Sequence, residues 1–320
     1  MKFKKLGRIF NPRDFNLAEG CVEFSQSPQT LVFDDFIRIY FSSRSTDSTG
    51  KFLSHICFID VTKDFKTILT VNEQQVLALG DLGTFDEHGI FPINIVRDGS
   101  RVLGYTTGWN RRVSVSVDTA IGIVESFDDG KTFSRLGSGP VLASSQNEAC
   151  LVGDGFVKII NDRYHMWYIF GKEWERFDDE SPPDRVYKIA HASSDDGVIW
   201  EKDGGSQIIE DVLGSYECQA LPTLVEVDGI FHMFFCYREA HDFRNSAGRG
   251  YRIGHAWSDD LVTWVRDDTN PQLSAGDKGD WDESMQCYPH VFECDSRVFL
   301  LYNGNQFGKF GFGVAELVDE

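Results

Sequence analysis

The chain has 320 residues and a formal net charge of −19, with 31 Lys and Arg against 50 Asp and Glu. This charge argues against nucleic-acid backbones and anionic membranes as partners. No apolar run reaches 18 residues, and the N-terminal MKFKKLGRIF lacks the apolar core and cleavage site of a signal peptide. The seven Cys occur without a CxxC pair, which favours reduced thiols, so we expect a soluble cytoplasmic protein.

Along the chain, helix signals are nearly absent, and short runs rich in Phe, Tyr, Ile and Val recur between DG, DD and ND turns. In chain order these runs are LVFDDFIRIYFSS (31–43), SRVLGYTTGW (100–109), DRYHMWYIF (162–170), GIFHMFFCYR (229–238) and SRVFLLYNG (296–304). Runs of this composition with such turns predict β-hairpins.

Two markers repeat in phase with the hairpins. An acidic residue lies five or six positions before a Pro or Gly in each unit, with gaps of 64, 61, 69 and 66 residues, at Glu23, Glu87, Glu148, Glu217 and Glu283. An Asp turn followed by an aromatic recurs at 126–133, 193–200 and 258–264. Each unit therefore indicates four strands, and repeats of this period are typical of a β-propeller.

The fold class that these repeats predict is all-β, with one five-bladed β-propeller domain spanning residues 1–320. The fifth unit ends after three strands, at GFGVAEL. We expect the N-terminal KFKKLGRIF to supply the missing outer strand, which closes the ring and removes an open sheet edge.

The recurring acids precede the innermost strands, so they are expected to converge in one central funnel. Clustered carboxylates shift one another's pKa values, and glycoside cleavage needs one protonated carboxyl and a second carboxylate. The candidate catalytic residues are Glu217, Glu87, Asp86 and Glu148. The alternative is that such acids only accept backbone N–H groups in turns and are structural.

These residues resemble the five-bladed glycosidases of glycoside hydrolase families 43, 32 and 130. Tyr216-Glu217-Cys218 followed by Pro222 matches the start of the fourth blade, where the resemblance implies that Glu217 is the general acid. The run 300–304 followed by Gly313-Val-Ala315 resembles the last blade of family 130. The Asn-Asp-Pro motif of family 32 is absent, and Glu148 replaces the third-blade Asp, so fructan or arabinan hydrolysis is not supported.

Other side chains are candidates for substrate binding. A basic stretch at 237–255 favours, within so acidic a chain, an anionic group such as phosphate or a sugar carboxylate, unless these side chains pair with the surplus acids. Its basic residues are Arg238, His241, Arg244, Arg249, Arg252 and His255. Trp109 suits sugar stacking, and His88 can orient the neighbouring acids. The full set is His88, Trp109, Arg238, His241, Arg252, Glu283 and His290.

For His290 the alternative is a core histidine. No motif for a nucleotide, metal or other cofactor is found, so none is expected. The leading hypothesis is a glycoside hydrolase acting on a carbohydrate. The alternatives are a glycoside phosphorylase with a basic phosphate site and a non-catalytic sugar-binding propeller.

Overall fold

The fold was examined in a computed structural model that describes residues 1–246, 248–268 and 273–318. It is nearly all β, with short 3₁₀ turns at Pro12–Asp14 and Ala18–Gly20 and one short helix, α1 (Asn305–Gly308). The strands fall into five consecutive units, defined here by their antiparallel pairings. Unit 1 contains β2 (Glu23–Val32), β3 (Ile37–Thr46), β4 (Phe52–Val61) and β5 (Ile68–Val71). Unit 2 contains β6 (Gly89–Asp98), β7 (Arg101–Arg111), β8 (Val117–Ser126) and β9 (Ser134–Arg135).

The next three units repeat this order. Unit 3 contains β10 (Cys150–Ile160), β11 (Arg163–Glu175), β12 (Asp184–Ser194) and β13 (Glu201–Lys202). Unit 4 contains β14 (Glu217–Val227), β15 (Ile230–Glu239), β16 (Arg252–Ser258) and β17 (Val265–Arg266). Unit 5 contains β18 (Cys287–Cys294), β19 (Arg297–Asn303), β20 (Phe312–Val318) and the N-terminal β1 (Lys2–Phe10).

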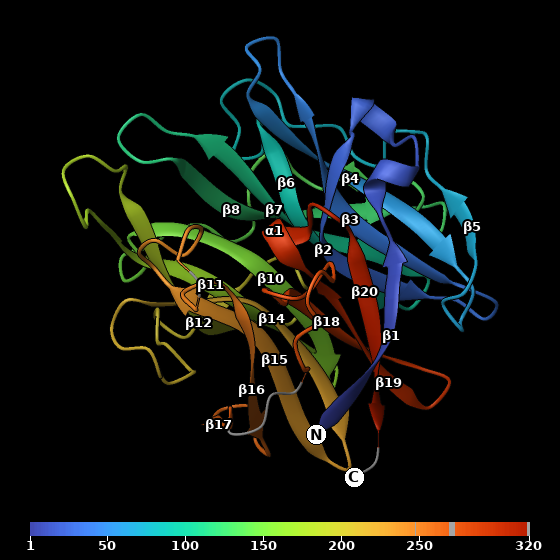
Figure 1. The fold of residues 1–320 in the computed structure, drawn as a ribbon. Coiled ribbons are helices and arrows are strands. Elements are labelled where there is room, and N and C mark those ends of the chain that lie inside the picture. Colours follow the sequence, from blue (N-terminus) through green and yellow to red (C-terminus); the bar gives the residue numbers. More distant parts are fainter. Residues whose placement is uncertain (247, 269–272, 319–320) are drawn as a thin grey trace.

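The expected pairing of the N-terminal strand is confirmed. β1 runs antiparallel to β20, with Lys2 opposite Val318 and Phe10 opposite Phe312. Figure 1 shows β1, in blue, alongside β20, in red. Units 1 and 2 form one sheet through a single parallel contact between Ser54 and Gly89, whereas units 3, 4 and 5 are separate sheets.

The apolar runs of the hairpins form the core. Along β3, for example, Ile37, Ile39 and Phe41 are fully buried and pack with β4 and the strands of unit 5. Burying such side chains stabilises the fold by about 1.5–3 kcal/mol each. The hairpins predicted from sequence are therefore confirmed in all five runs.

The Asp turns close the third strands of units 2, 3 and 4. Ser126 Oγ donates to Asp128, and the backbone N–H groups of Lys131 and Thr132 donate to the same carboxylate. Ser194 with Asp196 and Ser258 with Asp260 repeat this arrangement. The expected start of the second turn at Ser193 is wrong by one residue, because the side chain that bonds the Asp belongs to Ser194.

No helix in the described ranges has the length and apolarity needed to cross a membrane.

Candidate functional site

A cavity of about 600 Å³ lies where the first strands of the five units meet. That volume falls within the usual range of small-molecule sites. Each first strand contributes lining residues, among them Gln26 of β2, Phe91 of β6, Asp154 of β10, Ala220 of β14 and Tyr288 of β18. Further aromatic walls come from Phe24, Phe52, Trp109, Phe243, Tyr251 and Phe307.

A β-bulge that recurs in every first strand directs these residues toward the cavity. The register of every first strand against its neighbour shifts at the same place, between 26 and 29, 90 and 93, 153 and 156, 220 and 223, and 287 and 290. Such bulges bend a strand and redirect side chains, and they are common beside binding sites. In unit 3 the first residue inside the bulge is Asp154, which has a left-handed φ of 54°.

Asp154 is the acidic residue of this cavity among the lining residues that the structure describes. The residue is 8% exposed, and its backbone N–H donates to Thr107 Oγ1 at 2.7 Å. Burial raises the pKa of its carboxyl to about 7, against the opposing effects of the Arg185 charge and the Leu221 N–H. A carboxyl with this pKa holds a transferable proton near neutral pH, as a general acid requires.

Positive charge dominates the rest of the lining. The five cationic residues are Arg44, Arg185, Arg238, Arg244 and Lys309. Lys309 pairs with Glu23 at 3.6 Å, but no ion pair joins any of the four arginines to a carboxylate in the described ranges. Desolvation, and then the charges of Arg185 and Arg238, lower the pKa of Arg244. The cavity is therefore electropositive in a chain whose net charge is −19.

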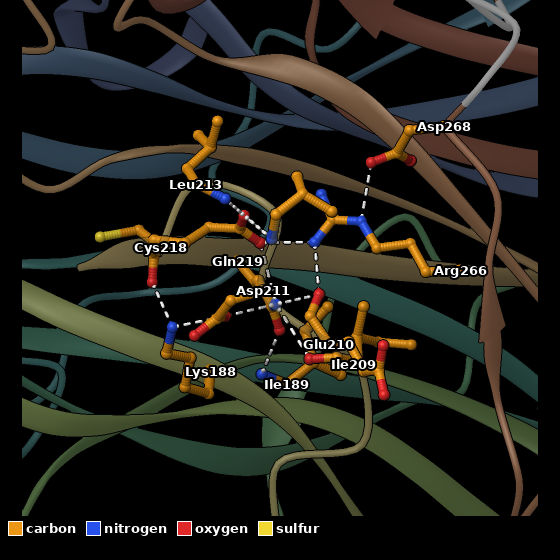
Figure 2. Close-up of polar contacts among 12 residues, drawn as sticks. Lys188, Ile189, Ile209, Glu210, Asp211, Leu213, Cys218, Gln219, Arg266 and Asp268 are labelled. Carbon is orange, nitrogen blue, oxygen red and sulfur yellow. Dashed lines mark hydrogen bonds and ion pairs between the residues drawn. The ribbon is translucent and has the colours of Figure 1, made fainter. Parts of the chain in front are cut away.

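The predicted acid Glu217 lies elsewhere, at the start of β14 and outside the cavity lining. Its Oε1 accepts from Arg266 Nη1 at 2.6 Å and from Gln219 Nε2 at 3.0 Å. Its Oε2 accepts from the N–H groups of residues 212 and 213 at 2.8 and 2.9 Å. Figure 2 shows the surrounding polar contacts, in which Arg266 also reaches Asp268. Four donors satisfy this buried carboxylate, an arrangement that suits a structural ion pair.

A buried carboxylate paired with a cation recurs in units 2, 3 and 5. Asp86 accepts from Arg135 Nε at 3.0 Å, Glu148 pairs with Lys202, and Asp282 pairs with Lys5 at 2.5 Å. Each cation comes from the outermost strand of its unit, β9, β13 or β1. The structure therefore does not bring Asp86, Glu148 and Glu217 together at the expected cavity: each is buried in its own unit and is absent from the cavity lining.

Glu87 and Glu283 also lie outside the cavity lining. Both brace a loop of shared sequence, GDxGxxDE, at 80–87 and 276–283. Glu87 accepts from the Gly83 N–H at 3.0 Å, and Glu283 accepts from the Gly279 N–H at 2.8 Å. The counterpart of Asp86 in unit 5 is accordingly Asp282, one residue before the predicted Glu283.

The predicted binding residues divide into two groups. Trp109 and Arg238 line the cavity, and His88 stacks behind Trp109 with ring centroids 5.9 Å apart. The other five, including His88 and Glu283, are outside the lining. His241 stacks on Phe177, Arg252 donates to the Gly248 carbonyl, and His290 accepts from Thr30. Burial lowers the pKa of His290 to about 3, as for a neutral core histidine.

Sequence reasoning missed Asp154, although a signal for it exists. In the other units the corresponding first residue of the bulge stands directly before a proline, at Ser27, Phe91, Leu221 and Tyr288. Unit 3 has Gly155 in place of that proline, and the earlier Gly153 matches the Glu-to-Pro spacing of the other units instead. Alignment of all five bulges leaves Asp154 as their acidic residue.

No family model matches the chain. Two curated relatives are each 33% identical over 323 residues, covering 99% of this chain and 99% of their own length. They are the uncharacterized proteins MT1551 and Rv1502 of Mycobacterium tuberculosis, from strains CDC 1551 / Oshkosh and ATCC 25618 / H37Rv.

Solved structures with a similar fold are glycoside hydrolases and related proteins. A complex of BT0996 with RGII has a TM-score of 0.74 at 15% identity, covering 98% of this protein and 91% of that one. A protein described within the GH130 family of mannoside phosphorylases and glycoside hydrolases has a TM-score of 0.68 at 15% identity, with 98% and 93% coverage. A thermostable family-43 glycoside hydrolase has a TM-score of 0.65 at 14% identity, with 95% and 94% coverage. The chain therefore belongs to the family of the two mycobacterial proteins, and its fold is that of the glycoside hydrolases of these families.

Proposed function

We propose that this protein is a glycan-active enzyme that cleaves a glycosidic bond in the central cavity, with Asp154 as the proton donor. The observation that carries the proposal is a buried carboxyl, with a pKa of about 7, at the wall of an aromatic-lined cavity of about 600 Å³. Aromatic rings suit the apolar faces of sugars. The similarity to glycoside hydrolase structures supports a carbohydrate ligand.

The architecture that we propose for this enzyme is a single domain of five blades, with one unit forming each blade. Two observations support it: the same bulge lies at the cavity in all five first strands, and the acid–cation pair recurs with β1 supplying Lys5 to unit 5. With β1 as the outer strand of the last blade, the ring closes between the two ends of the chain.

Phosphorolysis is the mode of cleavage that the cavity favours. Hydrolysis generally uses a second carboxylate to activate water or to attack the sugar, and Asp154 has no acidic companion among the described lining residues. A phosphate ion needs no such activation. In this step a phosphate oxygen bonds to the anomeric carbon as the glycosidic C–O bond breaks, and the leaving oxygen takes the Asp154 proton.

The test is a turnover screen of glycosides with and without inorganic phosphate, using the wild type and Asp154→Asn. Loss of the transferable proton should lower the rate by roughly 10²–10⁴ on substrates with poor leaving groups. Asp228→Asn is the matched control, because Asp228 is an exposed hairpin residue with a φ of 52° that Asn also tolerates. Full activity of Asp154→Asn, or a wild type that binds glycans without any turnover, would reject the proposal.

A further inference from the structure

A small side cavity of about 50 Å³ adjoins the main cavity, and both are lined by Ser116, Arg185, Arg238, Phe243 and Arg244. The side cavity adds Trp174, Pro183 and Asp184 to this shared set, and Asp154 does not line it. Its dimensions are those of a single small group rather than of a sugar ring. It is therefore a recess, rich in arginine, beside the space that holds Asp154.

Arg238 is the buried centre of this recess. It is 1% exposed, and its guanidinium stacks on Phe243 at 3.5 Å from the ring centroid. One end is anchored: Nη1 donates to the Glu239 carbonyl at 2.7 Å, and Nη2 donates to the Tyr187 hydroxyl at 2.9 Å. Its Nε has no hydrogen-bond partner among the residues that the structure describes. A buried charge with an unused donor is costly unless a ligand completes its contacts.

The absence of carboxylate partners sets these arginines apart. Elsewhere in the described chain, buried guanidinium groups have acids: Arg38 bonds Asp60 through two nitrogens, and Arg266 bonds Glu217 and Asp268. Arg185, Arg238 and Arg244 have no such ion pair within the described ranges, although the chain has 50 acidic residues. Asp184 also lines the recess, but its ion-pair partner within the described ranges is His241, at 4.0 Å. Three guanidinium groups against one carboxylate leave the recess net positive, and they can bind an oxyanion by charge-assisted hydrogen bonds.

We propose that Arg185, Arg238 and Arg244 form an oxyanion subsite, so that the glycan carries its own phosphate or carboxylate group. This inference rests on the proposed function for the identity of the ligand as a glycan. Asp154 lines the main cavity and not the recess. This supports a group borne by the sugar, since a phosphate that attacks the anomeric carbon must share the space of the reacting bond.

The experiment is isothermal titration of the full chain at a fixed 150 mM salt. The probes are glucose, glucose 6-phosphate, mannose 6-phosphate, glucuronic acid and inorganic phosphate. We expect the charged sugars to bind at least about tenfold more tightly than glucose. Arg244→Gln, in an exposed loop, should remove that preference, and Arg238→Lys should weaken it while keeping the charge. Arg97→Gln, an exposed arginine on β6 outside both cavities, is the control for net charge.

Four results would overturn the inference. Equal affinity for glucose and the charged sugars would remove the subsite, as would equal losses in Arg244→Gln and Arg97→Gln. A lack of binding by every anionic probe would do the same. If inorganic phosphate bound as tightly as the sugar phosphates, the recess would hold a co-substrate and the sugar-borne group would be wrong. Titrating Asp154→Asn in parallel separates the two proposals, because the subsite requires that variant to retain binding even where turnover is lost.

Discussion

Asp154 and Glu217 are both almost completely buried carboxyl groups, but the donors around them differ. Glu217 accepts from one guanidinium, one side-chain amide and two backbone N–H groups. Asp154 has the backbone N–H of Leu221 and the more distant charge of Arg185, which do not offset its burial, so its pKa rises to about 7. Burial without sufficient donors stabilises the protonated form. Asp154 is thus the buried carboxyl with fewer donors, and its raised pKa is what supports its proposed role.

The environment of Glu217 leads to a stability prediction. Glu217→Gln should lower the free energy of unfolding by about 3 kcal/mol, because it leaves the buried Arg266 with Asp268 as its remaining ion-pair partner. Urea unfolding measures this loss. Glu201→Gln is the control, since Glu201 is exposed on β13. A Glu217→Gln variant of unchanged stability whose turnover is abolished would favour the general-acid role expected from sequence over the ion-pair role.

At the scale of the element, the bulged first strand is what brings residues of all five units to one cavity. The hairpins and Asp turns could be predicted because alternation and turn residues are local signals. The direction of the side chains at the bulge could not be predicted, because two residues there oppose one residue on the neighbouring strand and the alternation fails. For the same reason the recurring acids, which stand before the bulge, were expected in the funnel. Glu148 and Glu217 instead pair with cations of the outer strands of their units, and Glu87 and Glu283 bind loop N–H groups.

The N-terminal strand gives the element-scale prediction. Lys5→Met should destabilise the fold by about 3 kcal/mol, because Asp282 would lose its cation and keep the Tyr302 hydroxyl as its side-chain donor within the described ranges. Lys4→Met is the matched control, since Lys4 is exposed on the same strand. Thermal unfolding of the two variants compares them directly. Equal melting temperatures for both variants would show that β1 does not complete unit 5 through this ion pair.

At the scale of the molecule, positive charge is concentrated at one cavity of an acidic chain. A chain with a net charge of −19 concentrates four arginines without carboxylate partners, in the described ranges, on one cavity. The sequence indicated the basic stretch that contains Arg238 and Arg244, but not Arg44 and Arg185, which come from other units. Their convergence depends on the arrangement of the units, so no local pattern could reveal it. Long-range pairing also hides the roles of the acids, because each cation partner lies some 50 residues or more along the chain.

The most direct test of the account is the pH dependence of kcat/KM for a glycoside found by the turnover screen. Since the pKa of Asp154 is raised to about 7, its carboxyl is protonated below that pH and ionised above it. A proton donor must be protonated in the free enzyme, so kcat/KM should fall about tenfold per pH unit above pH 7. Asp154→Asn should lack this descending limb. A wild-type profile that stays flat from pH 6 to 9, or a limb that persists in Asp154→Asn, would contradict the assignment of Asp154 as the proton donor.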